Sequence, residues 1–201
     1  MDARDLLLDE HGRMHSAAIT GDKATMAERT FGGLSDEQMR ARPREDLNSL
    51  AWLMWHIARA EDIFANLVLS GREQVFDDRW SARLKTPRVD FGVGMTKSEV
   101  ADLSAHIDVS ALREYRDAVG RRTQELIRGF GSADWSGELQ PDRLQKAAGL
   151  GCFGARGDMV AKAFLGRPRL GIMGALLVTH SALHMGEAQT VRTAGGFGTG
   201  V

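Results

Sequence analysis

Apolar residues recur three or four positions apart along most of this chain, while runs that alternate apolar and polar residues are almost absent. The first spacing places apolar side chains on one face of an α-helix, whereas strict alternation is typical of a half-buried strand. The pattern therefore predicts an all-α fold. Long helices are expected in residues 2–31, 48–70, 108–130 and 168–195. Four amphipathic helices bury their apolar faces most simply as a four-helix bundle.

Capping residues and breaks refine the bounds of these helices. The first helix is expected to begin at an Asp2 cap, to run past residue 18 and to be interrupted at Gly21 before it continues. Asn48 or Ser49 can cap the second, because short polar side chains accept from the free N–H groups of the first turn. Short extra helices are expected after capping-box patterns at residues 35–38 and 96–99, and at residues 158–165.

Two segments of the chain are predicted to form long loops. Residues 74–95 and residues 131–157 combine glycines, prolines and scattered charges without clear helical spacing. Long loops in compact domains often carry function. No internal repeat or linker divides the chain, so we expect a single domain over residues 1–201.

Composition excludes several classes of protein. With 43% hydrophobic and 26% charged residues, the chain has the balance of a soluble globular domain. The net charge of -1 and the lack of a basic run predict no nucleic-acid partner. No stretch reaches the roughly 18 apolar residues that span a membrane, and the acidic N-terminus is unlike a signal peptide. A lone cysteine, Cys152, cannot form an internal disulfide, so a cytoplasmic location is expected.

Three histidines carry the clearest chemical signal. His180 and His184 are four residues apart, which places both imidazoles on one face of a helix. His56 lies in a strongly apolar part of the second helix, where it is either a hydrogen-bonded core residue or a ligand. A buried imidazole without a partner is costly, and one divalent ion would satisfy all three. We therefore predict a metal site, and three imidazoles suit zinc, nickel, iron or copper.

Two charged residues lie near these histidines on the expected helices. Glu187 follows His184 by three residues and shares its face, so it is a candidate fourth ligand, hydrogen-bond partner of an imidazole or general base. A salt bridge to an arginine is the alternative. Arg59 lies about one turn from His56, so it is a candidate for binding an anionic substrate, the alternative being a surface arginine.

A second histidine pair competes with the first. His11 and His15 also have a four-residue spacing, but their surroundings are more polar and contain a glycine. We predict that they lie on a solvated or peripheral face, with a contribution to the pocket as the alternative. Glu61 and Asp62 are expected to pair with Arg59 or with arginines of other helices.

Three stretches together resemble the DinB-like (DinB/YfiT) superfamily. They are residues 49–62 around His56, the late His180-x-x-x-His184 motif, and residues 34–43, which match the usual approach to the second helix. The resemblance spans roughly residues 1–196. It implies a four-helix bundle with up-down-down-up order, often dimeric, and a site in which His56, His180 and His184 bind zinc, nickel, iron or another divalent ion.

The resemblance also implies a class of activity. Characterised branches include transferases and isomerases that use low-molecular-weight thiols such as mycothiol or bacillithiol. We therefore expect a metal-dependent enzyme that transfers such a thiol to a small electrophile. The alternatives are a metal-binding stress-response or ligand-binding module without catalysis, and a metal-dependent hydrolase. A small-molecule substrate and a homodimer are expected. The excess of arginine over lysine is typical of GC-rich bacterial genomes.

Overall fold

The computed structural model describes residues 2–22 and 24–198, and this part of the chain is helical without a β-strand. The predicted all-α fold is confirmed. Predictions that include positions 1, 23 and 199–201, such as a single domain over the whole chain, extend beyond the described residues. None of the described helices is both long enough and apolar enough to cross a membrane.

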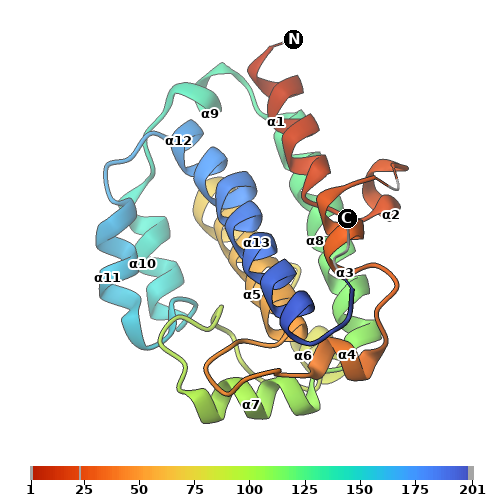
Figure 1. The fold of residues 1–201 in the computed structure, drawn as a ribbon. Helices are drawn as coiled ribbons and strands as arrows, with labels where there is room; N and C mark the ends of the chain where they lie inside the picture. The colour runs from red at the N-terminus through yellow and green to blue at the C-terminus, as the bar shows by residue number, and fades with distance from the viewer. Residues whose placement is uncertain (1, 23, 199–201) are drawn as a thin grey trace.

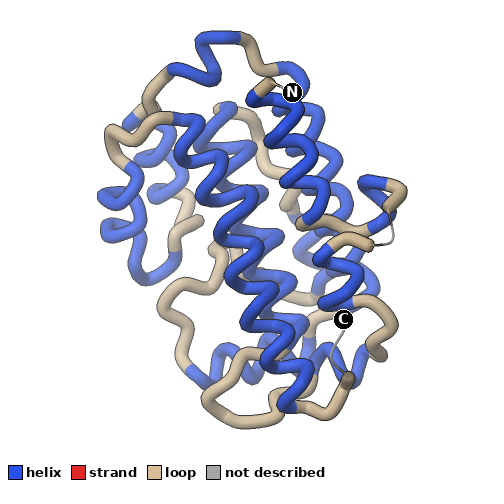
Figure 2. The backbone as a smooth tube through the Cα atoms, turned by 45° about the horizontal axis from the view of Figure 1, so that its top comes forward, coloured by secondary structure: helices blue, strands red, loops and turns tan. Residues whose placement is uncertain are grey.

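Four long helical segments lie side by side (Figures 1 and 2). In Figure 1, the first and last run downwards, whereas the second and third run upwards. The second segment packs against both the third and the last, and the first packs against the third. The segments are α1 (Ala3–Arg13), α5 (Leu50–Asp62) continued by η1 (Ile63–Ser70), α8 (Val109–Gly129), and α12 (Arg169–Met173) continued by η3 (Gly174–Thr179) and α13 (His180–Ala194).

Local capping explains where several helices begin. The Ser49 side chain accepts from the Trp52 N–H and caps α5, and Asp108 caps α8 in the same way. Both predicted capping boxes are present, and they begin α4 (Asp36–Arg40) and α7 (Lys97–His106). Helix beginnings were therefore readable from short polar residues.

The first predicted helix is divided differently from our expectation. The predicted break at Gly21 is present, where Gly21 is the left-handed C-cap of α2 (Ala17–Thr20) and α3 (Met26–Phe31) follows, but a further break after residue 13 separates α1 from α2. The backbone is extended at Ser16, whose hydroxyl donates to Asp117 on α8 over 2.6 Å. This contact holds the turn against the third long segment, so the break depends on tertiary structure.

The two predicted long loops contain short helices, which corrects that expectation. Residues 74–95 include α6 (Asp78–Leu84), and Asp77 caps it by accepting from the Trp80 N–H. Residues 131–157 include α9 (Ser132–Ser136), α10 (Pro141–Gly149) and a 3₁₀ turn, η2 (Gly154–Arg156). The predicted short helix after them is α11 (Gly157–Phe164). Elements of one or two turns are too short for periodicity to separate them from a loop.

Two π-helical segments adjoin the region of the predicted site. The first, η1, continues α5 directly after Asp62, and the second, η3, ends directly before His180. Such segments are rare in proteins, but those that occur often lie at functional sites. The wider turn changes which way the following side chains face.

A buried carboxylate links α5 to α8 and to the chain after η1. Asp62 is fully buried and accepts from the Tyr115 hydroxyl over 2.6 Å and from the Arg59 guanidinium over 3.2 Å. It also accepts from the backbone N–H groups of Val75 and Phe76 over 2.8 and 2.9 Å. The expected pairing of Asp62 with Arg59 is present.

Candidate metal centre

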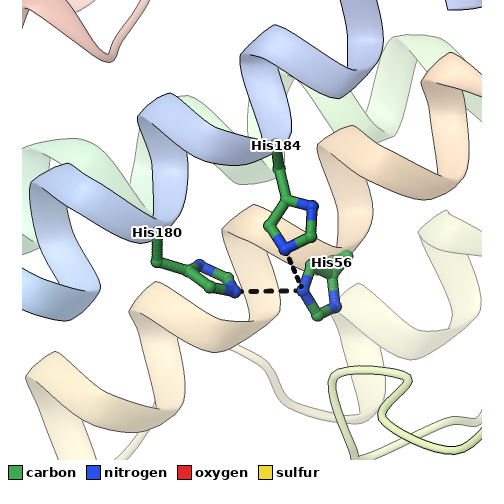
Figure 3. Close-up of side chains that lie close together, drawn as sticks. All are labelled: His56, His180 and His184. Carbon is green, nitrogen blue, oxygen red and sulfur yellow. Dashed lines mark hydrogen bonds between the residues drawn. The ribbon is translucent and has the colours of Figure 1, made fainter.

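Three imidazoles from two long helical segments converge at one point (Figure 3). His56 projects from α5, and His180 and His184 project from α13. The Nε2 atom of His56 lies 3.1 Å from Nε2 of His180 and 3.1 Å from Nε2 of His184. His56 is only 4% exposed, whereas the other two are partly exposed, so the cluster is open on the α13 side.

The hydrogen bonds of two rings assign their protons. Nδ1 of His56 contacts the Phe91 carbonyl oxygen, which can only accept, so this nitrogen carries the proton. Nδ1 of His184 donates to the Glu187 carboxylate over 2.9 Å. In the neutral rings, both Nε2 atoms therefore present lone pairs to each other across 3.1 Å.

That arrangement suits a cation. Two facing lone pairs repel each other, and an ion about 2 Å from each nitrogen would replace the repulsion with coordination. Metal-bound histidines commonly donate their second N–H to a carbonyl or carboxylate, as His56 and His184 do. The three side chains thus lie together in an arrangement that fits a divalent metal.

Burial keeps the histidines available as ligands. Burial, together with the neighbouring imidazoles of His180 and His184, lowers the pKa of His56 to about 3. Burial, together with the neighbouring His184, also lowers the pKa of His180 to about 4. Because a metal binds the neutral imidazole, protons do not compete for these two nitrogens near neutral pH.

The carboxylate of Glu187 and the amide of Asn48 hold the His184 ring in place. Glu187 accepts from His184 through one oxygen and from Asn48 Nδ2 through the other, over 2.8 Å. The hydrogen bond from His184 lowers the pKa of Glu187 and keeps it ionised. With both oxygens engaged, Glu187 has the geometry of the hydrogen-bond partner considered from sequence.

Sequence reasoning missed two of the groups that orient the site. Asn48 was considered only as a helix cap, but Ser49 takes that position and Asn48 faces Glu187. The Phe91 carbonyl is a backbone group from a loop, and no sequence signal could have identified it. Trp52 stacks on His56, with ring centroids 4.9 Å apart and planes 8° apart.

The family of this chain is shown by a match to a family model, and the matched residues include the three histidines. A model of the DinB superfamily matches residues 22–188. The chain belongs to the DinB superfamily. No curated protein matches this chain. The matched range contains His56, His180, His184 and Glu187, but not the His11/His15 pair of this DinB-superfamily protein.

Arg59 is placed differently from both sequence interpretations. It is fully buried, so it is not a surface arginine. All of its donor groups are directed to protein acceptors, which leaves none for a substrate, and we do not retain it as a substrate-binding residue. These acceptors are Asp62, Tyr115, Gln74 and the backbone carbonyls of Val89 and Asp90.

The second histidine pair corrects another expectation. His11 and His15 are fully buried rather than solvated or peripheral. Their Nε2 atoms lie 2.8 and 2.9 Å from the two carboxylate oxygens of Glu61, which was expected to pair with an arginine. The turn after α1 brings both rings against α5, which the polar local sequence did not reveal.

Removing the Glu187 carboxylate, which accepts from His184, is expected to weaken metal binding. Glu187→Ala should reduce affinity about 10- to 100-fold, because His184 loses the acceptor that fixes its proton and orientation. Competition titration of zinc against a chromogenic chelator measures the change. Glu114→Ala is the control, because this exposed glutamate pairs with Arg83. Equal affinities for the two variants would contradict the role of Glu187.

Proposed function

We propose that this protein is a metal-dependent enzyme that transfers a low-molecular-weight thiol, such as mycothiol, to a small electrophile. The observation that carries the proposal is the pair of unprotonated Nε2 atoms of His56 and His184, which face each other across 3.1 Å beside His180. Membership of the DinB superfamily supports it, because characterised branches of that family include transferases and isomerases that use low-molecular-weight thiols.

The roles of the residues follow from their placement. His56, His180 and His184 would hold the ion. When bound, such an ion lowers the pKa of a thiol that reaches it and so makes the thiol a nucleophile near neutral pH. The Phe91 carbonyl and Glu187 hold two of the rings in the tautomer that binds metal. Partial exposure of His180 and His184 leaves that side accessible to small molecules.

Metal content tests the first half of the proposal. His180→Ala is expected to lose one divalent ion per chain relative to the unchanged protein, because two remaining imidazoles bind far more weakly. Elemental analysis after gel filtration measures this loss. His106→Ala is a matched control, since this histidine is exposed at the end of α7. An unchanged ion content in His180→Ala would show that the three histidines are not the site.

Activity tests the second half. The metal-loaded protein is incubated with a small chromogenic electrophile, with and without mycothiol or another low-molecular-weight thiol. We expect turnover that requires both the thiol and the metal, and its loss in His180→Ala. Turnover without any thiol would instead indicate a metal-dependent hydrolase. No turnover with metal bound would favour a binding module without catalysis.

A further inference from the structure

We infer that His11, His15 and Glu61 form a second divalent-cation site, which joins the N-terminal part of the chain to α5. His11 lies on α1, His15 lies in the turn that follows it, and Glu61 lies one residue before the end of α5. Glu61 follows His56 by five residues, about 7.5 Å along a helix. This site does not depend on the proposed function of the three-histidine cluster.

The donor atoms already lie close together. The Nε2 atoms of His11 and His15 lie 2.8 and 2.9 Å from the two oxygens of Glu61, and the ring centroids are 4.4 Å apart. Two imidazoles and a carboxylate form a donor set typical of zinc and non-haem iron sites. These contacts leave no space for a water between the donors, whereas an ion about 2 Å from each could fit.

The charge at this position lacks a bonded cation. Glu61 is fully buried, and its hydrogen-bond partners are two imidazoles rather than a lysine or arginine. Arg116 lies nearby, but its Nη2 donates to the Met14 carbonyl instead. Burial of a carboxylate is costly unless a cation compensates it. A divalent ion held by Glu61 would supply that charge directly.

The remaining nitrogens show that protein hydrogen bonds do not complete the cluster. Nδ1 of His11 and Nδ1 of His15 are buried without a hydrogen-bond partner among the described residues. Two rings are thus held in the interior by contacts on one nitrogen only. Coordination at Nε2 would take the place of the hydrogen bonds to Glu61, with the proton of each ring on Nδ1, and would offset the desolvation of the rings.

The backbone of α8 fixes one of these rings. A Cβ built on Gly120 would lie 2.5 Å from Nδ1 of His15, so the imidazole packs directly on the helix at a position that no side chain could share. The backbone at Gly120 therefore limits how far the His15 ring can move away from Glu61. A ring confined in this way is already oriented toward the carboxylate, as a metal site requires.

The test is to count the metal ions bound by a variant that lacks the three-histidine site. Full-length protein and the double variant His180→Ala/His184→Ala are refolded with excess zinc or cobalt(II), desalted and analysed for metal. We expect about two ions per chain in the unchanged protein and about one in the double variant. Adding Glu61→Gln to the double variant should remove that ion, whereas adding Glu114→Gln, on exposed α8 surface, should retain it.

The rate of exchange gives a second readout. Because all three donors are fully buried, the ion in the double variant should be removed by a chelator far more slowly than the ion bound at the partly exposed three-histidine cluster. A double variant that folds but holds no ion would overturn the inference and leave a hydrogen-bonded network only, as would an ion retained after Glu61→Gln. If Glu61→Gln does not fold, the ion count of the double variant decides alone. If the unchanged protein binds one ion per chain and His180→Ala binds none, the three-histidine site is supported and the second site is rejected.

Discussion

Replacing Asp62 by alanine is expected to lower the free energy of unfolding by about 3–5 kcal/mol, the cost of breaking a buried ion pair by removing one partner. The guanidinium of Arg59 would remain fully buried without its carboxylate. The backbone N–H groups of Val75 and Phe76 would lose their acceptor, which anchors the chain after η1 to α5. The Tyr115 hydroxyl would lose its shortest hydrogen bond. All of these contacts are made to the Asp62 carboxylate, so one substitution removes them together.

Urea denaturation followed by circular dichroism measures this change. Asp102→Ala is the control, because its carboxylate is exposed on α7 and a substitution there should change stability by less than about 0.5 kcal/mol. Tyr115→Phe should cost less than Asp62→Ala, about 1–1.5 kcal/mol, because it removes one hydroxyl and leaves the carboxylate in place. A loss below about 1 kcal/mol for Asp62→Ala would show that water replaces these contacts.

Loading the three-histidine cluster is expected to have the second large effect. Zinc at a free concentration 100 times its dissociation constant should raise the free energy of unfolding by about 2.7 kcal/mol, and at 1,000 times by about 4.1 kcal/mol. The reason is that the three nitrogens of His56, His180 and His184 converge only in the folded chain. Binding therefore favours the folded state, and it also relieves the repulsion between two facing lone pairs.

Thermal unfolding with and without a chelator measures this stabilisation. The part that belongs to the three-histidine cluster is the difference between the unchanged protein and His180→Ala at the same zinc concentration, so any ion at a second site cancels. His106→Ala should respond to zinc as the unchanged protein does, because this exposed histidine lies outside both clusters. Equal responses of the unchanged protein and His180→Ala would contradict metal binding at the cluster.

Much of the fold was readable from local sequence. Helical spacing predicted the long segments, and short polar residues such as Ser49, Thr96 and Asp108 marked helix beginnings, because a cap acts on backbone groups within three residues. The break after residue 13 was not readable, since it is held by a contact between Ser16 and Asp117 on a distant helix.

The candidate site divides in the same way. The sequence by itself determined that His180 and His184 share a helix face, because that relation depends only on a spacing of four residues. Only the tertiary structure decided that His56 meets them, that Asn48 and Glu187 support them, and that His11 and His15 are buried against Glu61. These contacts depend on how the long helices pack and where the chain turns between them. Spacing along one segment carries no information about either.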